Sequence, residues 1–160
     1  MNTELLKLLS ENARTSEKDL AVMLGKTEEE IKAEIKSLEK QGIIAGYKAV
    51  VNWDMIDNPL VSAVVELKVI PKAGLGFEEI AEKIAGYKQV ESVYLMSGGF
   101  DLNVVVKGKT LQDVARFVAS ELATMESVTS TATHFVMCRY KEMDTSLFNA
   151  NKDGRGQIFI

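Results

Sequence analysis

The stretch that decides the N-terminal fold is TEEEIKAEIKSLEKQGIIAGY, residues 27–47. Thr27 and Glu30 have the spacing of a capping box, in which the two side chains satisfy backbone N–H groups at a helix start. Apolar residues then recur at helical spacing and predict one buried face: Ile31, Ile35 and Leu38. We expect Gly42 to end this helix. The stretch therefore predicts a capped amphipathic helix followed by a short strand pair over residues 43–51.

Two shorter helices are predicted before this stretch. An apolar stripe over residues 5–9 indicates the first, which stops near residues 12–14. Thr15 or Ser16 caps the second, and Gly25 ends it. One face of the second helix is expected to be buried through its apolar residues, Leu20, Val22, Met23 and Leu24. Three short helices and a β-wing, with a tight turn between helices two and three, predict a winged helix-turn-helix over residues 1–51.

The second part of the chain has a different pattern. After a linker over residues 52–60, rich in turn-forming residues, apolar residues alternate as they do in strands. The expected strands cover residues 60–70, 90–97, 102–106 and 131–140, and the expected helices cover 77–84 and 111–122. The order βαββαβ is that of the ferredoxin-like fold. We therefore predict an α+β protein with a ferredoxin-like domain over residues 61–143 and a polar tail over 144–160.

The first strand of this sheet indicates a second copy of the chain. Its odd-numbered residues form an apolar face expected to lie under the helices: Val61, Ala63, Val65, Leu67 and Val69. The other face still carries apolar residues: Val64, Ile70, Tyr94, Met96 and Val105. A sheet with helices on one side and apolar residues on both favours a partner over the open face. A homodimer would also suit paired DNA half-sites.

Composition sets limits on the chemistry. The 160 residues are 46% hydrophobic, with no signal peptide or long apolar segment, and the single Cys138 excludes an internal disulfide, so we expect a cytoplasmic protein. His134 is the only histidine and has no second histidine or cysteine at ligand spacing, so we expect no metal site. The sequence has no phosphate loop or dinucleotide fingerprint, and we expect no cofactor and no enzymatic activity. We expect Cys138 to be a buried thiol. The net charge of −4 is unfavourable for binding DNA, and residues 1–52 hold eight basic and nine acidic side chains.

Four segments resemble the Lrp/AsnC family of leucine-responsive and asparagine regulators. They are LAVMLG at residues 20–25, IKSLEKQGIIAGY at 35–47, SGGFDL at 97–102 and TAT at 131–133. The resemblance covers about residues 3–143, with the segments in the family's order. It implies a transcription regulator that assembles as dimers, often as tetramers of dimers, that is, octamers. It also implies binding to double-stranded promoter DNA and control by a small effector, typically an amino acid.

The third helix is the expected DNA-reading helix, because recognition helices contact base edges with outward residues of their N-terminal half. Five residues lie opposite its apolar stripe: Glu29, Lys32, Ala33, Lys36 and Lys40. Lys26 and Thr27, at the helix start, are candidates for contacts with phosphates or bases, and Arg14 and Lys48 are candidates for contacts with the DNA backbone. The run Glu28-Glu29-Glu30 is more acidic than this family segment usually is. Carboxylates stabilise a helix start, and a glutamate can also accept a hydrogen bond from a cytosine amino group.

The resemblance places an effector site on the second domain, at Ser97, Gly98, Gly99, Asp101, Thr131 and Thr133. An amino acid presents a carboxylate and an ammonium. Backbone N–H groups of a glycine turn can approach the carboxylate, Asp101 can accept a hydrogen bond from the ammonium, and the threonine hydroxyls add further hydrogen-bonding groups. Alternatively, Gly98 and Gly99 form only a hairpin turn, with Asp101 as its hydrogen-bonding residue.

Two other functions fit the same two-domain layout. Sirohaem decarboxylases resemble this family and have abandoned DNA binding. Such enzymes need basic and histidine groups around a tetrapyrrole carboxylate, and this chain has a single histidine. The chain is alternatively a regulator-like oligomer without DNA binding, which the acidic helix start would suit. A tetrapyrrole absorption shift would favour the enzyme, and a salt-sensitive gel shift would favour the regulator.

Overall fold

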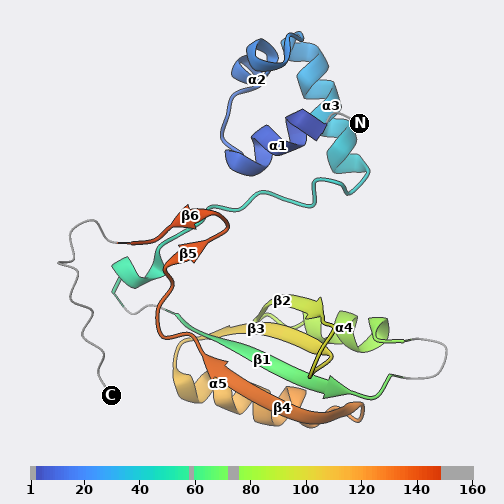
Figure 1. Ribbon diagram of the computed structural model, residues 1–160, viewed down its shortest axis with the longest axis vertical. Helices are drawn as coiled ribbons and strands as arrows, with labels where there is room; N and C mark the ends of the chain where they lie inside the picture. Colours follow the sequence, from blue (N-terminus) through green and yellow to red (C-terminus); the bar gives the residue numbers. More distant parts are fainter. Residues whose placement is uncertain (1–2, 58–59, 72–75, 149–160) are drawn as a thin grey trace. The chain divides into compact units, whose positions relative to one another are not determined.

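A computed structural model describes residues 3–57, 60–71 and 76–148 of the protein. The chain divides into two compact units, Met1–Ala49 and Val50–Ile160 (Figure 1). In the described residues, no helix is both long and apolar enough to cross a membrane.

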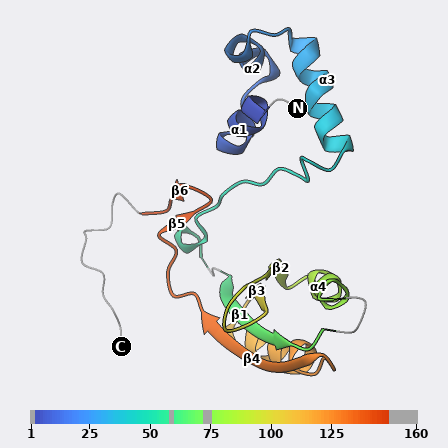
Figure 2. The same ribbon diagram turned by 45° about the vertical axis from the view of Figure 1, so that its right-hand side comes forward.

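The N-terminal unit consists of three helices, α1 (Thr3–Glu11), α2 (Glu17–Leu24) and α3 (Glu28–Lys40) (Figure 2). The helices bury a small apolar core: Leu5, Leu9, Leu20, Ala21, Ile31 and Leu38. Ile35 is partly buried against this core. Because α3 follows α2 after a three-residue turn, the unit has the predicted helix-turn-helix arrangement.

Local hydrogen bonds explain where these helices begin and end. The hydroxyl of Ser16 accepts from the Asp19 N–H at 3.1 Å and starts α2. Gly25 ends α2 in the left-handed conformation, with φ of 63°, and a non-glycine residue would be strained there. The capping box of Thr27 and Glu30 is present at the start of α3. The predicted caps of both helices are confirmed.

The predicted burial of Val22 and Met23 is wrong. Their side chains are 78% and 62% exposed, and Ala21 is buried instead. At about 100° per residue, Ala21 and Leu24 lie on the side of α2 that carries Leu20, whereas Val22 and Met23 point away from it. The apolar character of the two residues was therefore a poor guide to the buried face.

The predicted strand pair over residues 43–51 is also absent. These described residues form a turn and then an extended segment without ladder hydrogen bonds. Ile44 packs against the helical core and its N–H bonds the Leu38 carbonyl at 3.2 Å, which anchors only the start of the segment. An isolated two-stranded hairpin is marginally stable, so a segment this short gains little from pairing with itself.

The C-terminal unit is built on a four-stranded sheet, with β1 (Val61–Val69), β2 (Val90–Leu95), β3 (Leu102–Gly108) and β4 (Val128–Phe135). Its helices are α4 (Glu78–Ala85) and α5 (Leu111–Phe117), the latter continued by the π-helical segment η2 (Val118–Leu122). The sheet order is β2-β3-β1-β4, and each neighbouring pair is antiparallel. This topology confirms the predicted ferredoxin-like βαββαβ fold.

The two faces of the sheet differ as predicted, except that Ile70, predicted on the open face, lies beyond the end of β1 and lines a groove next to α4. Both helices cover one face (Figure 1), where Ala63, Val65 and Leu67 are fully buried. On the open face, Val64 pairs with Val105 across β1 and β3, and both are partly buried. Tyr94 of β2 is 55% exposed on the same face. An apolar strip therefore runs across the sheet face that neither α4 nor α5 covers.

Some segments outside this core differ from the prediction. The expected linker contains a short 3-10 helix, η1 (Trp53–Met55), and the expected tail begins with a hairpin of β5 (Lys141–Glu142) and β6 (Thr145–Ser146). Strand β4 ends at Phe135, five residues earlier than predicted. Cys138 lies beyond that end and is exposed, so its predicted burial is wrong. Residues 149–160 of the predicted tail lie outside the described residues.

Candidate functional site

The outward face of α3 carries the predicted base-reading residues. Ile31 and Leu38 are buried on the opposite side of the helix. All five predicted outward residues are exposed: Glu29, Lys32, Ala33, Lys36 and Lys40. In the described chain, none of the three lysines forms an ion pair. The helix therefore presents an accessible cationic edge.

Three of the five carboxylates of α3 form a hydrogen bond or an ion pair within the N-terminal unit. Glu34 accepts from the Lys26 ammonium at 2.7 Å. Glu39 accepts from the Tyr47 hydroxyl at 2.9 Å, and the pKa of Tyr47 is raised by desolvation and by this carboxylate. The third, Glu30, belongs to the capping box. Of these three partners only the Lys26 ammonium carries a positive charge, so Glu34 is compensated, whereas Glu30 and Glu39 keep their negative charge.

The capping box also fixes the charge of Glu30. Its carboxylate accepts from the Thr27 backbone N–H at 2.8 Å and from the Thr27 hydroxyl at 3.0 Å. These two hydrogen bonds lower the pKa of Glu30 below its usual range. The Thr27 hydroxyl in turn accepts from the Glu30 N–H. Thr27 is therefore mainly a helix cap, with its hydroxyl already bonded on both sides.

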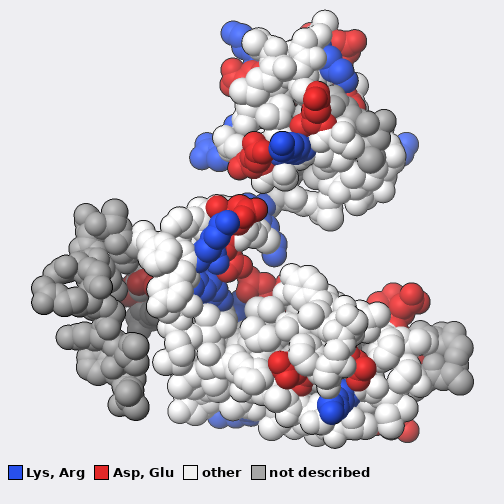
Figure 3. Space-filling model, in the orientation of Figure 1, with Lys and Arg blue, Asp and Glu red and all other residues white. Residues whose placement is uncertain are grey.

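The remaining predicted DNA contacts lie around α3 in the same unit. Arg14 is exposed in the turn between α1 and α2, where its N–H bonds the Asn12 side chain at 3.0 Å. Lys48 is exposed in the extended segment after α3. Lys26 is tied to Glu34, so its charge is partly compensated. Blue and red side chains are interspersed on the face of this unit that Figure 3 shows, so that face carries no broad basic patch.

Four of the six predicted effector residues lie together at one end of the C-terminal sheet: Ser97, Gly98, Gly99 and Asp101. Ser97, Gly98 and Gly99 form an exposed turn between β2 and β3, and the Met96 N–H bonds the Asp101 carbonyl at 2.8 Å across it. Gly98 has φ of 147°, which favours glycine. The turn is therefore a short hairpin connection with accessible backbone.

Asp101 attaches this turn to β1. Its N–H donates to the Leu67 carbonyl at 2.9 Å, and its Oδ2 accepts from the Val69 N–H at 2.8 Å. The side chain thus extends the β1–β3 pairing, whose last backbone partners are Leu67 and Leu102. Asp101 therefore has a structural role, and its Oδ1 has no hydrogen-bond partner among the described residues.

Thr131 and Thr133 lie on the other side of β1, in the edge strand β4. Thr131 pairs with Leu67 and Thr133 with Val65, so both threonines are on the helix-covered side of the sheet. In the described chain neither hydroxyl has a hydrogen-bond partner, and both side chains are partly buried. Because Leu67 lies between Asp101 and Thr131, these two residues are separated by two strand spacings, about 10 Å.

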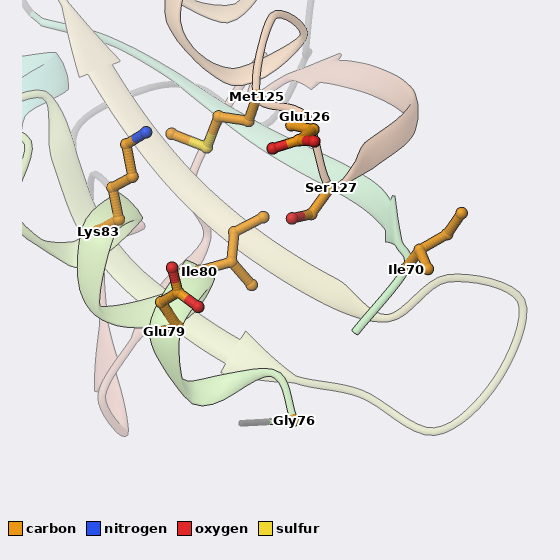
Figure 4. Close-up of a pocket in the computed structure, with 8 residues that line it drawn as sticks. All are labelled: Ile70, Gly76, Glu79, Ile80, Lys83, Met125, Glu126 and Ser127. Atoms are coloured by element: carbon orange, nitrogen blue, oxygen red, sulfur yellow. The ribbon is translucent and has the colours of Figure 1, made fainter. Parts of the chain in front are cut away.

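A separate groove lies near the same end of the sheet, between α4 and the segment before β4 (Figure 4). Its volume is about 100 Å³, and eight residues line it: Ile70, Gly76, Glu79, Ile80, Lys83, Met125, Glu126 and Ser127. None of the six predicted effector residues is among them. The Ile70 N–H bonds the Ser127 carbonyl at 2.9 Å, directly after the Val69 N–H that bonds Asp101.

The sole histidine is part of the open sheet face. His134 of β4 lies opposite Val64, and its Nε2 is 3.7 Å from Glu66 Oε1. The strand β4 is at the edge of the sheet, and the His134 side chain is 59% exposed. Among the described residues, no group of three or more metal-ligating side chains is close enough to hold a metal ion.

Two family models match the chain. Residues 3–45 match a winged helix-turn-helix DNA-binding domain, and residues 62–146 match the Lrp/AsnC ligand binding domain. The second match alone covers more than half of the chain. This protein belongs to the Lrp/AsnC family. It is a helix-turn-helix transcription regulator with a ligand-binding domain, as the resemblance implied.

Relatives of this Lrp/AsnC chain match nearly all of it. It is 44% identical to YugG of Bacillus subtilis, named an uncharacterized HTH-type transcriptional regulator, over 96% of this chain and 92% of that protein. It is 28% identical to the leucine-responsive regulatory protein of Haemophilus influenzae, over 89% and 85% of the two chains. The names of these relatives are those of regulators rather than enzymes.

Solved structures share the fold of this Lrp/AsnC chain. A transcriptional regulator from Neisseria meningitidis, solved as an L-Met complex, has a TM-score of 0.67 and 20% identity over 92% of this chain and 93% of its own. AsnC of E. coli has a TM-score of 0.63 and 20% identity over 86% and 91%. At these identities the likeness shows the two-domain fold.

Sequence reasoning missed the hydrogen-bond partners of two acidic side chains of this Lrp/AsnC chain. Glu34 and Tyr47 each bond a residue eight positions away, Lys26 and Glu39 respectively. Neither spacing is a local helical pair, so only the packing of the turn and the extended segment on α3 brings these groups together. The bond from Val69 to Asp101 likewise joins residues 32 positions apart.

Proposed function

We propose that this chain is a cytoplasmic homo-oligomer that reads double-stranded promoter DNA in a sequence-specific manner with the outward face of α3. The observation that carries the proposal is the exposed, unpaired edge of Lys32, Lys36 and Lys40 in the described chain. These residues are spaced four apart, so their charges extend over about 12 Å along the helix. A ridge of that length can follow DNA phosphates while the start of the helix lies against base edges.

The C-terminal unit binds a small effector of the amino-acid class. Support comes from the family match of residues 62–146 to a ligand-binding domain. The open backbone of Gly98 and Gly99 suits a carboxylate, and the Oδ1 atom of Asp101 suits an ammonium. The hydroxyls of Thr131 and Thr133, which have no hydrogen-bond partner among the described residues, add polar groups, and Ser97 contributes another. The structurally similar Neisseria regulator was solved with L-Met, which is an amino acid.

The assembly is a homodimer that forms through the open sheet face, and dimers associate further into assemblies such as octamers. Val64 and Val105 form the centre of an apolar strip on this face. A second copy placed over the strip would remove it from water and would pair two recognition helices on two half-sites.

A gel shift with the DNA upstream of the protein's own gene tests DNA binding. We expect a complex that weakens as salt rises, and weaker binding by Lys36→Ala than by wild type. Lys83→Ala, in the groove of the C-terminal unit, is the matched control and should bind as wild type does. If wild type forms no sequence-dependent complex, the proposal is wrong.

A thermal-shift screen over the twenty amino acids tests the effector site. An amino acid present at a hundred times its Kd should stabilise the protein by about 2.7 kcal/mol. Thr133→Val should reduce the shift, whereas Lys83→Ala should preserve it. The opposite pattern would move the effector site to the groove next to α4.

A further inference from the structure

The carboxylate of Glu29 has a position on α3 that its neighbours lack. Measured at about 100° per residue, Glu29 lies on the side opposite Ile31 and shares that side with Ala33 and Lys36. It precedes both of them along the helix. The N-terminal residues of a recognition helix are the ones that contact base edges in the major groove.

No intramolecular role accounts for this carboxylate. The capping box uses Glu30, the Lys26 ion pair uses Glu34, and Tyr47 bonds Glu39. Glu29 is exposed and has no hydrogen bond or ion pair within the described residues, so its acceptor oxygens are free. Helix-dipole stabilisation alone would be met equally by Glu28 at the previous position.

The neighbours of Glu29 favour contact with bases over contact with phosphate. A carboxylate next to phosphate is repelled, whereas a carboxylate that meets hydrogen-bond donors on a base edge is stabilised. In the major groove, the exposed donors are the amino groups of cytosine and adenine, and a carboxylate pairs with the cytosine N4 group. Ala33, one turn later on the same face, has a small side chain that permits close approach.

We propose that Glu29 is a specificity-determining residue that accepts a hydrogen bond from cytosine N4 in the major groove of each half-site. The inference rests on the proposed DNA-binding function. It assigns a required C·G base pair to the position that the start of α3 contacts. The nearby lysines supply affinity for the DNA backbone, and Glu29 supplies discrimination between bases.

Selection from a randomised DNA library, followed by sequencing, tests this assignment on the full-length protein. Wild type should enrich one C·G pair in each half-site. In Glu29→Gln the enrichment of this C·G pair should fall about tenfold. The preference should shift towards adenine, because glutamine pairs with adenine N6 and N7. Glu28→Gln removes the same charge from the same helix turn but from another side, and should keep the wild-type base preference.

The outcomes separate the inference from the function on which it rests. If wild type enriches a defined site and Glu29→Gln enriches the same bases, Glu29 does not read cytosine and the inference is wrong. The same holds if Glu28→Gln and Glu29→Gln change the preference alike, which would indicate a charge effect only. If wild type enriches no sequence, the proposed function itself fails. Circular dichroism checks that both variants keep α3, whose capping box neither substitution touches.

Discussion

The Oδ2 atom of Asp101 accepts a hydrogen bond from the backbone N–H of Val69 at 2.8 Å. The bond joins the start of β3 to the end of β1, beyond the last backbone pair of the two strands. It fixes the turn of residues 97–100 against the sheet, so the turn's free backbone groups have a defined position. An effector that used the other carboxylate oxygen would therefore bind a preorganised acceptor.

Replacing Asp101 should destabilise the C-terminal unit. Asp101→Ala leaves the partly buried Val69 N–H without its acceptor, and we expect a loss of about 1–3 kcal/mol in the free energy of unfolding. Asp101→Asn retains an acceptor oxygen and should lose less. Urea unfolding followed by circular dichroism measures both. Equal stability of wild type and Asp101→Ala would show that the hydrogen bond contributes nothing.

The two glycines of the turn should respond differently to alanine. An added Cβ meets no atom within 4 Å at either position, but only Gly98 has a positive φ, of 147°. Gly98→Ala should therefore cost about 1–3 kcal/mol through backbone strain alone. Gly99→Ala is the matched control and should change stability by less than about 0.5 kcal/mol. Thermal unfolding of the two variants distinguishes them, and similar values would refute the assigned turn geometry.

Loss of the Thr27 cap should destabilise the N-terminal unit. Thr27→Ala removes the acceptor for the Glu30 N–H, at an expected cost of about 1 kcal/mol, whereas Thr27→Ser should retain most of the stability. Thermal unfolding followed by the helical circular dichroism signal measures both variants. A Thr27→Ala protein as stable as wild type would contradict the capping assignment.

The cap also predicts a pH dependence. Because the folded state lowers the pKa of Glu30, its stabilising contribution is complete above the usual glutamate pKa and is lost as pH falls through the folded-state value. Wild type should therefore lose stability as pH falls below the ordinary glutamate pKa of about 4.5. Glu30→Gln should lose less over that range, and Glu28→Gln, which leaves the cap intact, should follow wild type. Melting temperatures across the pH series provide the measurement.

Charge on the open sheet face should break the proposed dimer. Val64→Lys places an ammonium at the centre of the apolar strip, where a second copy would have to desolvate it. We expect light scattering after gel filtration to give a smaller mass than wild type. Leu111→Lys, at an exposed position on α5, is a control for the same type of substitution. If both variants keep the wild-type mass, the subunits associate through another surface.

The periodic and capping signals in the sequence predicted most of the fold. Ile31 and Leu38 are buried at helical spacing, Thr27 caps α3, and the alternating residues of β1 face the core. These features depend on residues close together in the chain. Val22 shows the limit of such reasoning, because an apolar side chain does not specify which helix face the tertiary core will cover.

The candidate sites were less predictable because they depend on contacts between distant residues. The glycine turn and the exposed face of α3 follow from local patterns. The pairing of Lys26 with Glu34 does not, although it changes which cations are available for DNA. Likewise, Asp101 was expected to act within its own turn or on a ligand, and its bond to Val69 appears only once β1 and β3 pair.

The most direct test of the central claim is the salt dependence of DNA affinity, measured by fluorescence anisotropy for wild type and two triple variants. Substitution of Lys32, Lys36 and Lys40 by alanine should weaken binding and reduce the slope of log affinity against log salt by about 2–3. Substitution of Lys83, Lys88 and Lys109, in the C-terminal unit, should leave both unchanged. Wild-type affinity and slope in the α3 variant would contradict the claim that the lysine edge of α3 binds DNA.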